Sequence, residues 1–243
     1  MTPEIQESVL KRVVWSALTS RQSRFSVGDA KARRFDQAIT PFAASIDNSE
    51  AALASLAQVL GDEDDHVYLL QAEEVGLPDS IETVKSALGV LMIEQLPGES
   101  PSLELGIHAL SLADVPDMVE LAELTQPGPF TARTPEIGSF WGIRRNGKLA
   151  AMAGTRLNLD GYTEVSGICT HPGFRGHGFA SALSRFVAAQ IRARGDRPFL
   201  HAYADNHGAI ALYRKLGYDI WSEVNVAVIR RKPAVAAATD PGT

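Results

Sequence analysis

Hydrophobic and polar positions follow two different periods in the second half of the chain. Residues 112–125 and 181–194 carry apolar side chains at helical spacing, so both segments predict amphipathic helices. Residues 140–145 and 148–157 flank Asn146-Gly147, the strongest two-residue turn signal, and predict an antiparallel hairpin. We also expect strands at 163–170, 198–204, 218–221 and 224–229, and a short helix at 209–216 ended by Gly217. The second half therefore predicts an α/β arrangement.

The first hundred residues carry a weaker pattern. They predict a helix at 3–18, a strand at 66–71, a helix at 81–88 and a strand at 90–96. Residues 97–101 (PGESP) have the composition of a linker. We therefore predict a smaller N-terminal α/β domain over residues 1–105, a second domain over 106–232, and a disordered Ala- and Pro-rich tail over 233–243.

Composition narrows the class of protein. The 243 residues are 45% hydrophobic, enough for one large core or two modest ones. No run of eighteen apolar residues occurs and the start, MTPEIQESVLKR, lacks the apolar core of a signal peptide, so we expect a soluble, cytoplasmic protein without membrane partners. The single cysteine, Cys169, excludes an intramolecular disulfide framework, and no ligand spacing suggests a metal.

Charge is divided unevenly along the chain. Residues 1–105 hold 8 Lys/Arg against 17 Asp/Glu, whereas residues 106–243 hold 15 against 12. A basic second half suits an anionic cofactor, and the acidic half either docks on it, faces a cationic acceptor or is ordinary solvated surface. The net charge of −6 argues against nucleic-acid binding.

The segment from Val165 to Ala180 carries the clearest chemistry. An apolar strand, VSGICT, runs into HPGFRGHGFA and then directly into a helix. Gly176 and Gly178 allow close approach of the main chain, the helix N-terminus favours an anion, and Arg175 adds donors for phosphate. A Walker A loop is excluded because Gly147-Lys148 is followed by Leu149, and the glycine order and the following helix disfavour a dinucleotide fold. A phosphorylated cofactor is the prediction.

Two motifs resemble those of one family. Residues 175–180 (RGHGFA) are similar to the R/Q-x-x-G-x-G/A signature of the GNAT superfamily of N-acetyltransferases, and residues 206–218 (NHGAIALYRKLGY) to its N-x-x-A-x-x-L-Y-x-x-x-G-F/Y segment. The resemblance covers roughly residues 107–232. It implies a mixed, mostly antiparallel central sheet flanked by helices, with an extra N-terminal domain as in tandem GNAT-like proteins.

The same resemblance implies a function and a co-substrate. We expect an acetyl-CoA-dependent N-acetyltransferase acting on a small-molecule or peptide amine by direct attack on the thioester. A longer acyl-CoA donor and a non-catalytic acyl-CoA-binding regulatory module are the alternatives. We leave the identity of the amine and a homodimer open.

Several residues match positions of known role in the family. The resemblance implies that Tyr213 protonates the departing thiolate and that Asn206 positions the pantetheine arm, caps its helix, or both. The residues expected to contact the cofactor are Ile168, Cys169, Thr170, Arg175, Gly176, His177, Gly178, Phe179, Ala180 and Asn206. Cys169 is interpreted as a buried strand residue and not as a nucleophile.

Two residues compete for the role of general base. Glu164 lies four residues before the strand segment expected to pair with pantetheine, where some members of the family have a glutamate. His201 lies five residues before Asn206, where other members have a glutamate. An imidazole is a competent base at neutral pH, and each residue could instead be structural. The sequence leaves this choice open.

Overall fold

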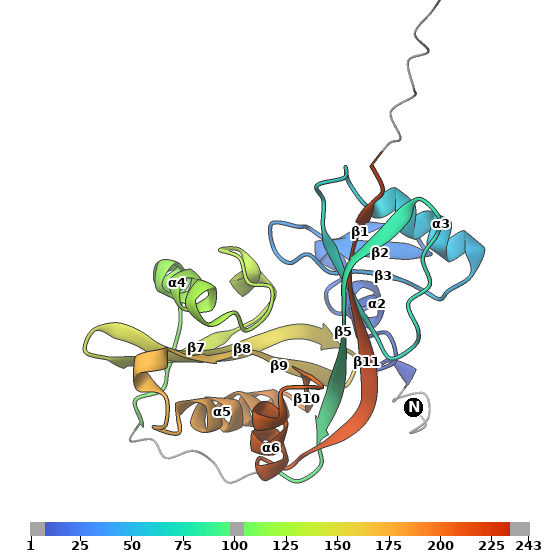
Figure 1. Cartoon of the computed structure of the whole chain (residues 1–243). Coiled ribbons are helices and arrows are strands. Elements are labelled where there is room, and N and C mark those ends of the chain that lie inside the picture. The colour runs from blue at the N-terminus through green and yellow to red at the C-terminus, as the bar shows by residue number, and fades with distance from the viewer. Residues whose placement is uncertain (1–7, 98–104, 234–243) are drawn as a thin grey trace, which may run out of the picture.

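The computed structural model describes residues 8–97 and 105–233. Most of the strands form one eight-stranded mixed sheet (Figure 1) in the order β4-β11-β5-β10-β9-β8-β7-β6. In that order the strands are β4 (Val67–Gln71), β11 (Tyr218–Arg231), β5 (Ile81–Glu94), β10 (Arg197–Tyr203), β9 (Tyr162–Thr170), β8 (Lys148–Leu159), β7 (Phe140–Arg145) and β6 (His108–Ala109). Only β9 and β10 are parallel; every other neighbouring pair in this sheet is antiparallel. This confirms the predicted fold class.

Helices cover the two faces of the sheet unequally. Helices α5 (Phe179–Ala193) and α6 (His207–Lys215) lie below the sheet in Figure 1, whereas α4 (Val115–Thr125) lies above β7, β8 and β9. Apolar residues of α5, including Leu183, Val187 and Ile191, are fully buried in one core cluster with Met92 of β5. The apolar face of α5, which the helical spacing in the sequence predicts, therefore packs on the lower face of the sheet.

A smaller unit packs at one end of the main sheet. It contains a three-stranded sheet, β1 (Ser26–Gly28), β2 (Ala32–Phe35) and β3 (Ala43–Ser45), with α2 (Val13–Thr19) and α3 (Glu50–Val59). A parallel bridge between Phe42 and Tyr68 joins this unit to β4. Buried side chains of α2 share a core cluster with Leu157, Phe199 and Val224 of the main sheet. One apolar core therefore joins the two sheets.

Most elements predicted for the second half are present. The hairpin β7–β8 turns at Asn146 and Gly147, both with positive φ (52° and 79°), as the Asn-Gly signal predicts. The two strands expected at 218–221 and 224–229 are one strand, β11, with a register shift between Ile220 and Ser222. The shift explains the break in the hydrophobic pattern, because a bulge interrupts alternation without ending the strand.

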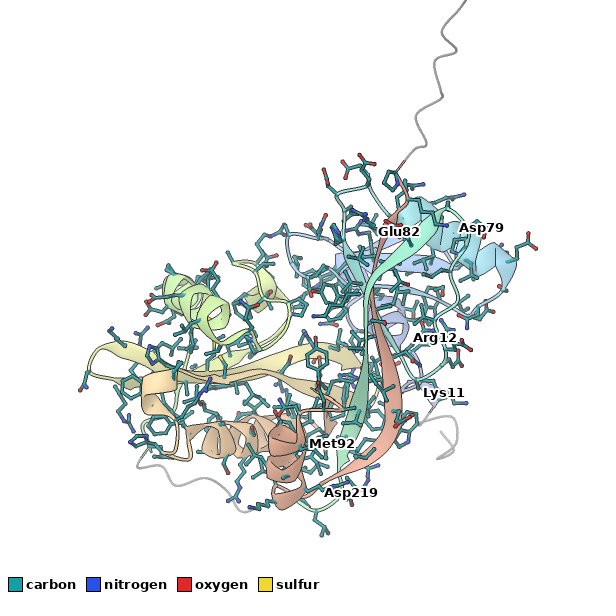
Figure 2. All side chains as sticks on the ribbon, viewed as in Figure 1. Lys11, Arg12, Asp79, Glu82, Met92 and Asp219 are labelled. Carbon is teal, nitrogen blue, oxygen red and sulfur yellow. The ribbon has the colours of Figure 1, made fainter. Side chains whose placement is uncertain are left out.

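The N-terminal predictions need correction. Residues 81–88 are not a helix but the first part of β5, a 14-residue strand that pairs with β11 and β10. The pairing with β11 overrides the weak helical spacing of IETVKSAL. In Figure 2, the labelled residues Glu82 and Met92 lie near the two ends of this strand. The boundary predicted near residue 105 therefore does not separate two sheets, because β4 and β5 precede it and belong to the main sheet.

Other N-terminal predictions were incomplete. The strand predicted at 66–71 is β4, and the helix predicted at 3–18 appears as α2 among the described residues. Strands β1, β2 and β3 and helix α3 were not predicted. The proposed tail after Pro233 and most of the proposed linker lie outside the described residues. No helix in the described ranges is long and apolar enough to cross a membrane.

Candidate active site

The parallel pair β9 and β10 separates part-way along its length. The two strands pair from Arg197 and Tyr162 up to Phe199 and Glu164, and no pairing follows. Beyond that point β10 continues against β5 through Tyr203, while β9 continues against β8 through Thr170. The main-chain edge of β9 that faces β10 is therefore free over residues 165–170, and an extended ligand can pair with it.

A bulge in β9 accompanies this separation. Met152 pairs with Cys169 and Gly154 pairs with Ser166, so β9 has one more residue than β8 in this interval. Gly167 adopts a φ of 62°, and a Cβ placed there would lie 2.9 Å from the Phe140 ring. Bulges bend the strand that carries the extra residue. Gly167 thus bends β9 within the free edge, just after its separation from β10.

The loop after β9 has the geometry of an anion cradle at the start of α5. Gly176 and Gly178 have φ values of 83° and 74°, and a Cβ on either would meet no atom within 4 Å. Among the described residues, no side chain caps α5 and its first turn contains no acid. The N–H groups of that turn are therefore available, in a 15-residue helix whose dipole favours negative charge there.

Basic and aromatic side chains surround this cradle. Arg175 is exposed beside the glycines, and the Arg145 guanidinium lies 5.0 Å from the centre of the Phe179 ring. The other face of the loop is fixed by His177, whose Nδ1 lies 3.0 Å from the Arg175 carbonyl oxygen and whose ring stacks on Phe179. Arg145 was not among the predicted site residues because it is distant in sequence from the glycine motif.

Helix α6 places two predicted residues beside the separated strands. The Asn206 side chain accepts a hydrogen bond of 3.1 Å from the Ala209 N–H, so it is the N-cap. Tyr213 is 8% exposed, and burial raises the pKa of its hydroxyl to about 12. Tyr213 therefore stays protonated at neutral pH and is available as a proton donor.

Glu164 and His201 form one cluster with a third residue, Arg156. Arg156 Nε and Nη2 each donate to Glu164 over 2.9 Å, and His201 Nδ1 lies 2.8 Å from Glu164 Oε1. Burial of Glu164 opposes ionisation, but the Arg156 charge and the hydrogen bonds from His201 and Arg156 lower the pKa of Glu164 to about 2. Glu164 is therefore ionised, and its oxygens are occupied.

A second bulge explains why Arg156 reaches Glu164. Thr155 pairs with Val165 and Asn158 pairs with Thr163, so Arg156 and Leu157 together lie opposite the single residue Glu164. The Leu157 N–H also points to Glu164, at 3.3 Å from Oε2. His201, in contrast, has a buried Nε2 with no hydrogen-bond partner among the described residues. The cluster thus leaves one basic nitrogen available.

Comparison with known proteins identifies the fold family. Residues 140–226 match the family model described as FR47-like protein. A solved structure from Novosphingobium aromaticivorans DSM 12444, assigned to the GNAT family of acetyltransferases, is 39% identical over 92% of this chain and 99% of its own, with a TM-score of 0.86. The chain belongs to the GNAT family.

More distant GNAT structures share the fold alone. A GCN5-related N-acetyltransferase from Kribbella flavida is 19% identical, with a TM-score of 0.63 over 98% of this chain and 96% of its own. A GCN5-related N-acetyltransferase-like protein from Streptococcus suis 89/1591 is 13% identical, with a TM-score of 0.54 over 94% of this chain and 98% of its own. Among curated proteins, none matches this sequence. Membership makes the chain an acyltransferase of a family that generally uses acetyl-CoA.

In this GNAT protein, a cleft of about 200 Å³ lies between the separated strands and the N-terminal part of the chain. Four of the predicted residues line it: Ile168, His201, Asn206 and Tyr213. Phe42, Tyr68 and Leu70 from the N-terminal part line it as well, together with Arg156. These four were missed by the sequence analysis. For Arg156 a signal existed, because the Asp160-Gly161 turn predicts a hairpin that brings residue 156 near residue 164.

The remaining predicted residues lie apart from the cleft. Residues 175–180 form the loop and first turn of α5, and Cys169 and Thr170 end β9. Burial raises the pKa of the Cys169 thiol to about 11, which suits a structural cysteine. Within the described residues, no three His, Cys, Asp or Glu side chains gather as a metal site.

Proposed function

We propose that this chain is an acetyl-CoA-dependent N-acetyltransferase in which His201 accepts the proton of the attacking amine. The contacts of the two imidazole nitrogens carry the proposal. Nδ1 lies against the ionised Glu164, and the buried Nε2 has no partner among the described residues. Because a carboxylate only accepts hydrogen bonds, we assign the proton of the neutral ring to Nδ1, which leaves Nε2 as the basic atom.

In this proposal Glu164 orients the His201 ring and does not itself abstract the amine proton. All four of its close donors are protein groups, and its low pKa makes it a poor proton acceptor at neutral pH. Its charge stabilises the imidazolium that forms when His201 takes a proton, as carboxylates paired with a catalytic histidine do. The two bases that the sequence left as alternatives are thus given different roles.

The chain has features that suit acetyl-CoA, which supplies an acetyl group activated as a thioester. The first-turn N–H groups of α5 and the exposed Arg175 would hold the pyrophosphate. The free edge of β9 over residues 165–170 would pair with the amides of the pantetheine arm, and Asn206 and Tyr213 flank that edge from α6.

The proton steps follow from these positions. As the amine nitrogen bonds to the acetyl carbon, His201 removes the amine proton at Nε2, and as the carbon–sulfur bond breaks, Tyr213 donates its hydroxyl proton to the sulfur. Solvent then returns a proton to Tyr213 and removes one from His201, so the net products are an amide and a free thiol. Each step is general acid–base catalysis of the kind worth about 10²-fold or more.

The experiment is to measure free thiol release from acetyl-CoA with a panel of primary amines and amino acids across pH 5 to 9. His201→Gln is expected to lower kcat by about 10²-fold or more and to abolish the acidic limb of the profile. Tyr213→Phe is expected to lower kcat by a similar factor. Tyr218→Phe is the matched control, since the Tyr218 hydroxyl is buried without a partner among the described residues and Tyr218 does not line the cleft. It should keep the wild-type kcat.

Three results would contradict the proposal. An unchanged acidic limb in His201→Gln would remove this residue as the base. Faster turnover with longer acyl-CoA donors would favour the longer-chain transferase. Tight CoA binding without thiol release from any amine would favour the regulatory module.

A further inference from the structure

The wall of the cleft that the N-terminal part and β11 form is apolar and lacks acids. Phe42, Tyr68, Leu70, Val224 and Val226 line it. Among the described residues that line the cleft, none is an aspartate or a glutamate. An acceptor with several ammonium groups would lose its hydration here without gaining an anionic partner, which is costly. The cleft therefore disfavours polyamines and aminoglycosides and favours an acceptor with an apolar body.

Arg156 has a hydrogen-bonding group that the protein leaves unused. Its Nε and Nη2 are taken by Glu164, whereas Nη1 has no acceptor within hydrogen-bond distance among the described residues. The residue is 9% exposed and lines both the main cleft and a smaller neighbouring cavity. The Phe42 ring backs the guanidinium, with its centre 4.8 Å from Cζ. A rigidly held guanidinium with a free Nη1 is suited to bind a carboxylate.

We propose, on the basis of the proposed function, that the acceptor is an α-amino acid with an apolar side chain, whose carboxylate binds Nη1 of Arg156. One oxygen, Glu164 Oε1, lies 2.9 Å from Arg156 Nη2 and 2.8 Å from His201 Nδ1. The amine-binding base and the carboxylate-binding guanidinium are therefore neighbours, as the amine and carboxylate of an α-amino acid are. Phe42, Tyr68 and Leu70 then contact the side chain.

Charge balance supports the same acceptor. With a neutral His201, the ion pair of Arg156 and Glu164 sums to zero, and a bound carboxylate makes the site negative. When His201 takes the amine proton, that negative charge is balanced. The substrate carboxylate thus favours formation of the imidazolium inside a site of low dielectric constant.

The substrates themselves provide the first test, because they leave the protein unchanged. We compare kcat/KM for L-phenylalanine and L-leucine with phenylalaninamide, 2-phenylethylamine and spermidine, using acetyl-CoA. The amino acids should exceed the amide and the decarboxylated amine by about tenfold or more, the worth of a charge-assisted hydrogen bond. Equal or faster turnover of the amide, of phenylethylamine or of spermidine would overturn the proposal and leave the acetyltransferase function intact.

Arg156→Lys provides the second test, by separating KM from kcat. Arg156 also holds Glu164, which orients His201. If the substitution disturbs His201 through Glu164, kcat therefore falls by the same factor for every amine. Loss of carboxylate binding instead raises KM for phenylalanine about tenfold or more and leaves KM for phenylethylamine unchanged. Equal changes of KM for both substrates would assign Arg156 a structural role only.

Calorimetry with product analogues tests the same pocket without turnover. N-acetyl-L-phenylalanine should bind the wild-type protein about tenfold or more tightly than N-acetyl-L-phenylalaninamide. If that preference holds while no amine causes thiol release from acetyl-CoA, the proposed function fails and the carboxylate site stands. If the amide binds equally well, the carboxylate site is refuted whatever the activity.

Discussion

Replacing Glu164 with glutamine is the sharpest test of the buried cluster. The change keeps the shape but removes a charge that two nitrogens of Arg156 and one of His201 contact. Arg156 is then a buried cation without its anion, and breaking such a pair typically costs about 3–5 kcal/mol. The pKa gives a similar figure, because a fall from 4.5 to about 2 corresponds to roughly 3 kcal/mol of stability near neutral pH.

The pH dependence has a definite sign. The folded-state pKa of Glu164 is lower than the unfolded value, so its contribution is complete above about pH 4.5 and is lost as the pH falls towards about 2. Urea unfolding of wild type and Glu164→Gln at pH 7, 5 and 3 should therefore show a difference of about 3 kcal/mol at pH 7 that shrinks at pH 3.

The same variant should lose activity, because the new amide can donate to His201 Nδ1 and thereby place the ring proton on Nε2. We expect kcat to fall by about 10²-fold or more. Glu94→Gln is the matched control, since Glu94 is a buried partner of Arg192, at 2.6 and 2.7 Å, and does not line the cleft. It should lose stability and keep kcat. A stability difference below 1 kcal/mol that does not vary with pH would refute the role given to Glu164.

Two further predictions concern the co-substrate site. Arg175→Ala should weaken CoA binding by about 1–3 kcal/mol in calorimetry, through loss of a charge-assisted hydrogen bond to phosphate, whereas Arg194→Ala at the other end of α5 should bind CoA normally. Equal affinities of wild type and Arg175→Ala would contradict the pyrophosphate site. The Cys169 thiol, with a pKa of about 11 caused mainly by burial, should react with iodoacetamide at pH 8 only slowly in the native protein and fast after unfolding. Fast native labelling, complete at one thiol per chain, would show that Cys169 is not buried.

Local signals predicted most of the second half correctly. The Asn146-Gly147 turn fixes the β7–β8 hairpin through two adjacent residues, and the α5 pattern needs only the helical period. The glycines at 176 and 178 likewise carry their information locally, because positive φ is required at each. Such features depend only on residues that are adjacent in the sequence, so a single sequence is enough to predict them.

The position of β5 and the N-terminal side of the cleft depend on distant partners instead. Residues 81–88 have apolar residues at helical spacing only, and pairing with β11, more than a hundred residues later, overrides that local pattern. Phe42 reaches the cleft because the small N-terminal unit packs at the end of the main sheet, where Phe42 bridges to Tyr68 of β4. Nothing adjacent to these residues in the sequence signals that contact, which is why this side of the cleft was not predicted.

The separation of β9 from β10 links the two halves of the candidate site. Pairing stops at Phe199 and Glu164, and Glu164 is also the residue that holds Arg156 and His201. Glu164 lies at the last paired position, whereas His201 lies two residues beyond it, where β10 pairs only with β5 and the edge of β9 is free. Under the proposed function, the base would be held from two sides, by the pairing of His201 with Leu91 of β5 and by its contact with Glu164, beside the edge where the pantetheine arm would lie. Under the proposed function, a shift in register between β9 and β10 would displace Glu164 from His201 and alter the ligand edge together, so catalysis and co-substrate binding would depend on the same few backbone hydrogen bonds.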